Sequence, residues 1–178
     1  MAARVRPPGL RGQQRRPRPR DRLDRRRGSG EVPGDALDER DGGLFLCLQR
    51  EIREMLASGR GGAIVNLASI AGLNGIPHSG PYAATKHAVV GLTKTAGLEY
   101  SSRGVRVNAV APGAIKTDII ARAISLGQYD EETIVDMHPI ARMRQPREIA
   151  AGIHWLLSDQ SSFVAGAILN IDGGFQAK

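Results

Sequence analysis

The sequence has few of the features that mark secreted, membrane or metal-binding proteins. Its single cysteine, Cys47, excludes an internal disulfide bond, as is usual in a reducing compartment. No apolar run is long enough to span a bilayer, and the N-terminus lacks the apolar stretch of a secretory signal. No Cys and His residues have the spacing of a metal site. These absences predict a cytoplasmic protein with no metal centre and no membrane partner.

Basic charge is concentrated at the N-terminus. Residues 1–40 contain 12 arginines and 6 acidic residues, whereas the rest of the chain is almost neutral, so nearly all of the net charge of +7 belongs to this segment. The segment also holds half of the prolines, and its few large apolar residues follow no helical or strand period. Burial could not offset its ordering entropy, so we expect residues 1–41 to be a disordered Arg/Pro/Gly-rich leader.

From residue 42 onward the sequence alternates between strand and helix patterns. Apolar residues recur at helical spacing between Leu44 and Leu56, and short apolar runs at 63–68, 105–111 and 165–171 predict buried strands. Helices are expected at about 81–101 and from Pro146, with one or two short helices within 117–140. This alternation is typical of parallel βαβ units, so residues 42–178 are expected to form an α/β fold with helices on both faces of the sheet.

Tyr82 and Lys86 are the most informative pair in the chain. Residues at i and i+4 lie on one face of a helix, and an ammonium held that close to a phenol favours the phenolate. Such a phenol can donate and accept a proton near neutral pH. Ser69, at the end of the strand predicted at 63–68, could hold a substrate oxygen beside it. In isolation, Tyr82 and Lys86 would be a surface pair and Ser69 a turn cap.

Several separate segments, in order and at matching spacing, resemble the short-chain dehydrogenase/reductase family. They are NLASIAG (66–72), YAATK (82–86), RVNAVAPGAIKTD (106–118), HPIARMRQPREIA (138–150) and FVAGAILNIDGGF (163–175). The resemblance covers about Gly43 to Gln176 and implies a doubly wound Rossmann sheet that binds NAD or NADP.

The resemblance also implies a role for each matching residue. Tyr82 would be the general acid/base, Lys86 would assist it and hold the nicotinamide ribose, and Ser69 would orient the substrate oxygen. The cofactor would contact Tyr82 and Lys86 and also Pro112, Gly113, Ile115 and Thr117, and residues from Asp118 to about Met143 would form a substrate lid. Thr117 would also suit the cap position of the helix that follows it. The substrate would be a small alcohol or carbonyl compound.

Part of the family pattern is missing from this sequence. No Gly-rich turn links a strand to a helix N-terminus, so nothing in the sequence would seat a pyrophosphate, and the Rossmann sheet is expected to be incomplete. NAD and NADP therefore cannot be distinguished. Arg40 or Asp41 stands where the family has a catalytic Asn, so this fourth catalytic residue is absent.

The leader itself suggests an unusual origin. A GC-rich coding of Val-Asn-Asn-Ala-Gly, an element that the family carries after its fourth strand, yields Gln-Gln-Arg-Arg when it is read from its third base. The chain has Gln13-Gln14-Arg15-Arg16 at about the expected distance before Ser69. The hypothesis is that residues 1–41 are an out-of-frame reading of a dehydrogenase gene.

Three functions remain open at this point. The first is an NAD(P)-dependent oxidoreductase acting on a secondary alcohol or ketone, impaired by loss of the Gly-rich cofactor motif. The second is a non-catalytic remnant that acts as a dimerising module, because family members form homo-oligomers through the helices that correspond to residues 43–57 and 81–101. The third is a nucleic-acid binder with a basic arm, which the absence of aromatic residues from that arm disfavours.

Overall fold

A computed structural model describes residues 34–127 and 130–177. The helices and strands are α2 (Gly34–Ser58), β1 (Gly62–Leu67), α3 (Gly80–Tyr100), β2 (Val105–Pro112), α4 (Asp118–Ser125), α5 (Glu131–Asp136), α6 (Pro146–Leu157) and β3 (Ile168–Ile171). Four 3-10 turns, η1 to η4, comprise Ile70–Gly72, Ser101–Arg103, Asp159–Ser161 and Phe175–Ala177. In this part of the chain, no helix is both long enough and apolar enough to cross a membrane.

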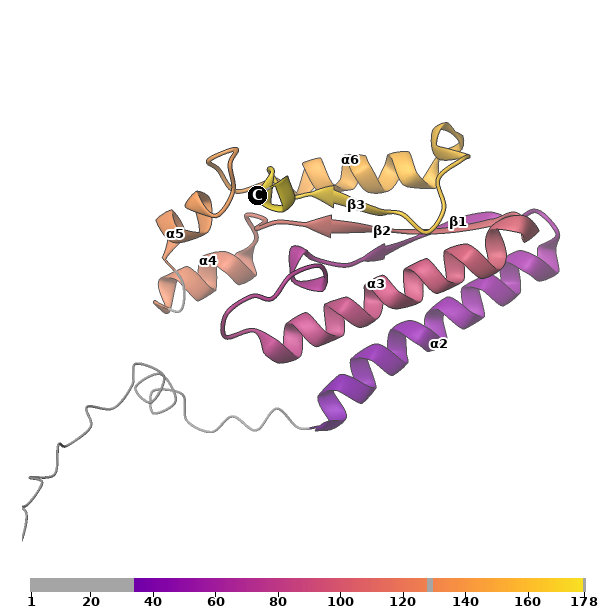
Figure 1. Cartoon of the computed structure of the whole chain (residues 1–178), viewed down its shortest axis with the longest axis horizontal. Helices are drawn as coiled ribbons and strands as arrows, with labels where there is room; N and C mark the ends of the chain where they lie inside the picture. The colour runs from indigo at the N-terminus through magenta and orange to yellow at the C-terminus, as the bar shows by residue number, and fades with distance from the viewer. Residues whose placement is uncertain (1–33, 128–129, 178) are drawn as a thin grey trace, which may run out of the picture. The chain divides into compact units, whose positions relative to one another are not determined.

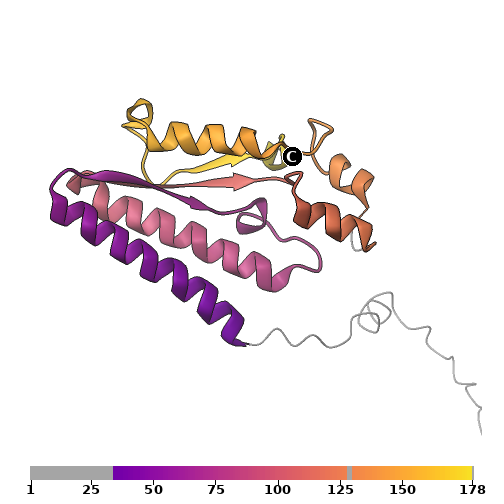
Figure 2. The same cartoon turned by 180° about the vertical axis from the view of Figure 1, so that it is seen from behind.

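The three strands form one parallel sheet in the order β1-β2-β3. Ile64 pairs with Val107 across the first interface, and Ala109 pairs with Ile168 across the second. Among the described residues β1 is paired on one side only, so it forms an edge of the sheet. Helices α2 and α3 cover one face and α6 covers the other (Figures 1 and 2). This confirms the predicted α/β class with helices on both faces.

The central strand β2 explains why the layers hold together. Seven of its eight residues are buried, because helices pack on both faces, as is usual for parallel sheets. Val107 packs with Leu48 and Ile52 of α2, whereas Val110 packs with Ile149 and Leu156 of α6. Each such side chain stabilises the fold by roughly 1.5–3 kcal/mol relative to leaving it exposed.

The first helix begins earlier than the sequence pattern indicates. Apolar periodicity places the onset of order near Gly43, but α2 starts at Gly34, inside the predicted leader. Residues 35–41 lack large apolar residues other than Leu37, so they carry no period that could reveal the helix. Residues 1–33, which include Gln13 to Arg16, lie outside the described residues, as do the side chains of Arg40 and Asp41.

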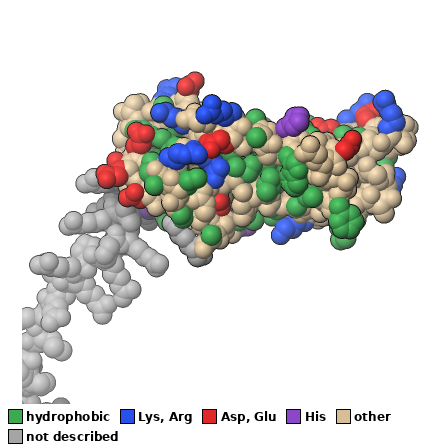
Figure 3. Space-filling model, turned by 90° about the horizontal axis from the view of Figure 1, so that it is seen from above, with side chains coloured by type: hydrophobic (Ala, Val, Ile, Leu, Met, Phe, Trp, Pro, Cys, Tyr) green, Lys and Arg blue, Asp and Glu red, His purple; other side chains and the backbone are tan. Residues whose placement is uncertain are grey.

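Charges on the outer face of α6 are mixed in sign. Figure 3 shows that face with lysine and arginine side chains beside acidic ones, and with hydrophobic side chains at the surface between them. Trp155, Leu157 and Phe163 are among the exposed large apolar residues. The mixture agrees with the near balance of basic and acidic residues after residue 40.

All three strands run in the same direction, so their carboxyl ends meet at one edge of the sheet. The turn η1, the start of α3 and helices α4 and α5 lie at this edge (Figure 1). In open α/β sheets, ligands bind at the carboxyl ends of the strands. This edge is therefore where the candidate site is assembled.

Candidate active site

Ser69 lies two residues beyond the carboxyl end of β1. It caps the turn η1, because its Oγ accepts the main-chain N–H of Ala71 at 3.1 Å. The residue is only 8 % exposed. The cap interpretation of Ser69 is thus confirmed, and it leaves the hydroxyl hydrogen available to a second acceptor.

Tyr82 and Lys86 lie one turn apart in the first turns of α3, where Pro81 suits the start of a helix. The Tyr82 ring is half-exposed, at 48 %, and its hydroxyl makes no hydrogen bond to any described residue. The Lys86 Nζ lies 5.8 Å from the centroid of the Tyr82 ring. The ammonium and the phenol are therefore held on the same face, as the i, i+4 spacing predicts.

A hydrogen bond near the start of this helix joins it to the end of the first strand. The Lys86 Nζ donates to the carbonyl oxygen of Leu67, the last residue of β1, at 2.8 Å. Close packing brings η1 against α3, since a Cβ on Gly72 would lie 2.5 Å from the Lys86 carbonyl oxygen. The structure thus brings Ser69, Tyr82 and Lys86 to one corner of the sheet. No direct hydrogen bond joins the Ser69 and Tyr82 hydroxyls.

The predicted cofactor segment begins where β2 ends. Pro112 is the last residue of the strand, and the Gly113 N–H continues the ladder by donating to the Ile171 carbonyl at 3.2 Å. A Cβ on Gly113 would lie 2.5 Å from Nε2 of His138 and 3.2 Å from Cα of Asp172. Only glycine fits at this position, so the main chain there is fixed by close packing on this side.

Ile115 and Thr117 complete the segment. Ile115 forms an isolated parallel bridge with Arg144, in which the Arg144 N–H donates to Ala114 and the Lys116 N–H donates to Arg144. In such a bridge the N–H and C=O of Ile115 itself point away from Arg144, and no described residue bonds them. Thr117 caps α4 by accepting the Ile120 N–H, which confirms the cap expected from the sequence.

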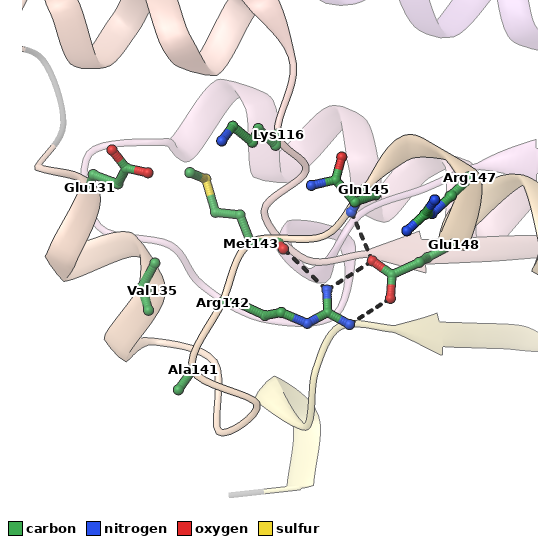
Figure 4. Close-up of a pocket in the computed structure, with 9 residues that line it drawn as sticks. All are labelled: Lys116, Glu131, Val135, Ala141, Arg142, Met143, Gln145, Arg147 and Glu148. Atoms are coloured by element: carbon green, nitrogen blue, oxygen red, sulfur yellow. Dashed lines mark hydrogen bonds and ion pairs between the residues drawn. The ribbon is translucent and has the colours of Figure 1, made fainter.

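Sequence reasoning missed a strong ion pair near this segment. Figure 4 shows the guanidinium of Arg142 facing the carboxylate of Glu148, and the two nitrogen–oxygen distances are 2.9 and 2.7 Å. Glu148 also accepts the Gln145 N–H at 2.8 Å. The Arg142 guanidinium and then the Gln145 N–H lower the pKa of Glu148 to about 2. The helix start at Pro146 agrees with the sequence expectation, and Glu148 at the third helical position, typical of a capping box, could have revealed the bond from the Gln145 N–H to Glu148.

Two neighbouring pockets lie beside this ion pair. The larger, of about 700 Å³, is lined by the Arg142–Glu148 pair together with Lys116, Glu131 and Met143, as Figure 4 shows. The smaller, of about 200 Å³, shares those last three residues and is otherwise lined by Thr117 and by Ile120, Ala121 and Ile124 of α4. The predicted lid therefore contributes an apolar wall next to Thr117.

Known proteins resemble this chain over most of its length. Residues 35–176 match a family model described as "Enoyl-(Acyl carrier protein) reductase". A 2,5-dichloro-2,5-cyclohexadiene-1,4-diol dehydrogenase of Sphingobium indicum is 47% identical over 135 residues, which are 76% of this chain and 54% of that protein. A cyclohexanol dehydrogenase of an Acinetobacter species is also 47% identical over 135 residues, covering 76% of this chain and 51% of its own.

The fold has close counterparts among solved structures. The structure of ElxO with NADP bound superposes with a TM-score of 0.76 at 36% identity, covering 84% of this chain and 62% of that one. The chain spans about half the length of the curated relatives it matches. The family match extends further toward the N-terminus than the resemblance read from the sequence, and it starts close to the start of α2. The chain belongs to the short-chain dehydrogenase/reductase family.

Proposed function

We propose that this chain carries the proton-transfer side of an NAD(P)-dependent oxidoreductase acting on a secondary alcohol or the corresponding ketone. The observation that carries the proposal is the corner formed by Ser69, Tyr82 and Lys86, which the bond from Lys86 to Leu67 holds together. The nicotinamide of NAD(P) would supply the hydride acceptor or donor. The chain's own residues would handle the proton and the substrate oxygen.

The proton steps follow from the placement of the three groups. The Tyr82 side chain is 48 % exposed and no described residue bonds its hydroxyl, so it can reach a substrate oxygen. In alcohol oxidation the Tyr82 phenolate would take the hydroxyl proton while the hydride leaves the carbon, and in ketone reduction the phenol would give a proton to the forming alkoxide. The Ser69 hydroxyl would donate to the same oxygen. Lys86 would stabilise the phenolate through its nearby charge.

The segment after β2 fits the nicotinamide side of the cofactor. No described residue accepts the N–H of Ile115, which lies beside the closely packed main chain at Gly113. A carboxamide could accept from this N–H, and Thr117 lies two residues further on. Pro112 and Gly113 would border the nicotinamide ring. These contacts support NAD or NADP equally, because none of them reaches the adenosine ribose.

The pyrophosphate side of the cofactor has no counterpart among the described residues. Within 34–127 and 130–177, no strand leads through a Gly-rich turn into a helix, which is the arrangement that binds pyrophosphate through main-chain N–H groups. We infer that the chain binds the dinucleotide weakly and turns over slowly. The proton-transfer chemistry is retained, whereas most of the binding energy for the cofactor is lost.

A titration of the purified chain with NADH and NADPH, followed by turnover at millimolar cofactor, tests both parts. We expect binding weaker than micromolar and a slow alcohol oxidation that Tyr82→Phe abolishes. Micromolar affinity with full turnover would contradict the inferred impairment. No cofactor-dependent turnover at millimolar NAD or NADP would contradict the oxidoreductase function itself.

The small pocket beside Thr117 favours an alicyclic substrate. Its wall is formed by Ile120, Ala121 and Ile124, and its volume of about 200 Å³ accommodates a six-membered ring. The two curated relatives act, by their names, on cyclohexadiene diol and cyclohexanol compounds. We therefore propose a cyclic secondary alcohol or cyclic ketone as the substrate class, since a preformed ring loses little conformational entropy on binding.

Cyclohexanol and 2-hexanol, which have the same number of carbons, separate this substrate class from a general alcohol dehydrogenase. We expect kcat/KM to be about tenfold or more in favour of cyclohexanol, as pocket complementarity usually gives. Replacing Ile124 by Ser should reduce that preference by making the wall polar. Equal efficiency on the two alcohols would refute the alicyclic proposal while leaving the oxidoreductase function intact.

A second function, a non-catalytic dimerising module, is favoured by the exposed surface of α2 and α3. Phe45, Leu46 and Leu98 are 48 %, 63 % and 85 % exposed, and a pocket of about 130 Å³ lies between the two helices. Sedimentation analysis tests this function. Leu98→Glu should weaken self-association, whereas Leu126→Glu, which changes an exposed leucine at the end of α4, should leave it unchanged.

A further inference from the structure

His138 is a buried side chain to which the proton-transfer scheme gives no task. It follows α5, is only 3 % exposed, and lies against three separate parts of the chain. Its Nδ1 is 2.8 Å from the carbonyl oxygen of Ile134, and its Nε2 is 3.1 Å from the main-chain nitrogen of Ala114. Its ring lies 5.7 Å from the ring of Phe175, centroid to centroid. A single imidazole thus joins α5, the end of β2 and the C-terminal turn.

These contacts fix the form of the imidazole. A carbonyl oxygen can only accept, so Nδ1 must carry the hydrogen that bonds Ile134. A main-chain N–H can only donate, so Nε2 must offer its lone pair to Ala114. His138 is therefore a neutral ring with the proton on Nδ1. Both nitrogens are used, and neither is free for proton transfer.

The His138 ring also occupies the space that a side chain at position 113, directly after β2, would need. A Cβ at Gly113 would lie 2.5 Å from Nε2 and 2.8 Å from Cδ2 of His138. The absence of a side chain at Gly113 thus leaves room for the His138 ring, and the ring in turn accepts the N–H of Ala114. This packing, the bond from the Gly113 N–H to Ile171 and the bond from the Ala114 N–H to His138 hold the Gly113–Ala114 main chain in the observed orientation.

That orientation determines where the unbonded N–H of Ile115 points. The Ala114 N–H is held by His138, and the Ala114 carbonyl accepts the Arg144 N–H at 3.1 Å. His138 therefore holds the Gly113–Ala114 peptide and Arg144 holds the Ala114–Ile115 peptide, so the main chain is fixed on both sides of the Ala114 Cα. We propose that His138 is a positioning residue that sets the Ile115 N–H for the nicotinamide side of the cofactor and couples it to α5. The cofactor part of this inference depends on the proposed function.

Three substitutions separate positioning from simple packing. His138→Gln can place an acceptor oxygen near the position of Nε2 and keep the Ala114 bond. His138→Asn reaches only as far as Nδ1, so it can keep the Ile134 bond but must lose the Ala114 bond. His138→Leu fills much of the space and loses both bonds. A purely structural role predicts that Gln and Asn behave alike.

Two measurements on the full chain test the proposal. The first is hydrogen exchange at the Ala114 amide, without cofactor, and the second is the Kd for NADH and NADPH. In His138→Asn and His138→Leu we expect the exchange rate of the Ala114 amide and the Kd for the dinucleotides to rise roughly 2- to 10-fold, as for loss of one neutral hydrogen bond. In His138→Gln both quantities should stay near their wild-type values. If the Kd for NADH and NADPH is the same in all three variants while the exchange rate of the Ala114 amide differs among them, the proposed role of His138 in cofactor binding is overturned.

The two readouts keep this inference separate from the proposed function. If the wild type binds no dinucleotide, the oxidoreductase proposal fails, and the exchange of the Ala114 amide alone decides whether His138 orients the main chain. Unchanged Ala114 exchange in His138→Leu would overturn the positioning role whatever the cofactor does. Thermal unfolding of each variant shows that the folded state is retained.

Discussion

The Lys86 ammonium donates a hydrogen bond to the carbonyl oxygen of Leu67 at 2.8 Å. Leu67 ends β1, and Ser69 follows two residues later, so this bond holds the start of α3 against the part of the chain that carries Ser69. The same nitrogen lies 5.8 Å from the centroid of the Tyr82 ring. Lys86 therefore supplies both a positive charge beside the phenol and a link between two elements of the site.

Tyr82→Phe is expected to reduce alcohol oxidation by roughly 10²–10⁴-fold, because the proton acceptor is removed while the ring remains. The Kd for NADPH should change little. Tyr100→Phe is the matched control, since Tyr100 ends the same helix and packs against the core rather than the site. Turnover assays at millimolar cofactor measure both variants. Equal turnover in Tyr82→Phe and wild type would exclude Tyr82 as the acid/base.

Lys86→Met keeps the length of the side chain but removes the charge and the bond to Leu67. We expect turnover to fall by roughly 10²-fold or more and Ser69 to become less well fixed. Lys94→Met, further along α3, removes a lysine without touching β1 and should leave turnover unchanged. The paired assay distinguishes a local effect from a general effect of lost charge. A similar loss in both variants would contradict the role assigned to Lys86.

The Arg142–Glu148 pair predicts a defined pH dependence of stability. The pKa of Glu148 is lowered to about 2 by Arg142 and by the Gln145 N–H, so the pair stabilises the fold above the ordinary carboxyl pKa of 4.5 and is lost as the pH falls toward 2. Glu148→Gln should lower Tm by a constant amount above pH 5, and this difference should vanish between about pH 4.5 and pH 2. High salt should reduce the difference, because the side chains are partly exposed. A Tm difference that persists at pH 2 would show that the charge is not the cause.

Two glycines of α3 offer a matched test of the packing between this helix and the loop before β3. A Cβ on Gly97 would lie 2.5 Å from the Cα and N of Gly166, so Gly97→Ala should destabilise the protein by about 1–3 kcal/mol. A Cβ on Gly91 would meet nothing within 4 Å, so Gly91→Ala should stabilise it by up to about 1 kcal/mol. Urea unfolding measures both changes, and two changes of the same sign would disprove the packing explanation.

Arg106 should be far more important for stability than its neighbour Arg103. Its guanidinium donates to the carbonyl oxygens of Leu156, Val164 and Ser158 and to Ser161 Oγ, at 2.9 to 3.4 Å. Arg106→Ala removes four hydrogen bonds from a charged donor, of which Asn108 and Ser161 replace only a part, and should cost on the order of 3 kcal/mol. Arg103 is exposed and lies only beside the Tyr100 ring, so Arg103→Ala should cost less than about 1 kcal/mol. Equal urea midpoints for the two variants would contradict this account.

Strand positions could be predicted from the sequence where Gly or Pro borders an apolar run. The run predicted at 105–111 is observed at Val105–Pro112, and the run predicted at 63–68 is observed at Gly62–Leu67. The last strand was expected from residue 165 but starts at Ile168. Before Ile168 the main chain still bonds β2 through the Gly166 N–H and the Ala167 carbonyl, but the Asn108 side chain accepts the Ala167 N–H and donates to the Val164 carbonyl, so the regular ladder starts later. Such a contact, between residues more than fifty positions apart, leaves no local pattern.

The candidate site was predictable to a similar extent. The spacing of Tyr82 and Lys86 gave their common helix face, and the strand end gave the location of Ser69. The bond from Lys86 to Leu67 could not be predicted, because it depends on how closely η1 packs on α3. The bond from the Ala114 N–H to His138 also joins distant segments, so the sequence placed His138 only within the expected lid and the segment 138–150.

The unpaired side of β1 has a consequence for handling this protein. Apart from the Leu67 carbonyl, which Lys86 bonds, the main-chain groups of β1 that point away from β2 have no bonding partner among the described residues, and Leu67 is 54 % exposed beside them. An edge of this kind accepts any extended peptide, including the same strand of a second molecule. Solubility should therefore fall steeply with concentration, and a charged residue introduced on the outward side of β1 should improve yield more than charge added elsewhere.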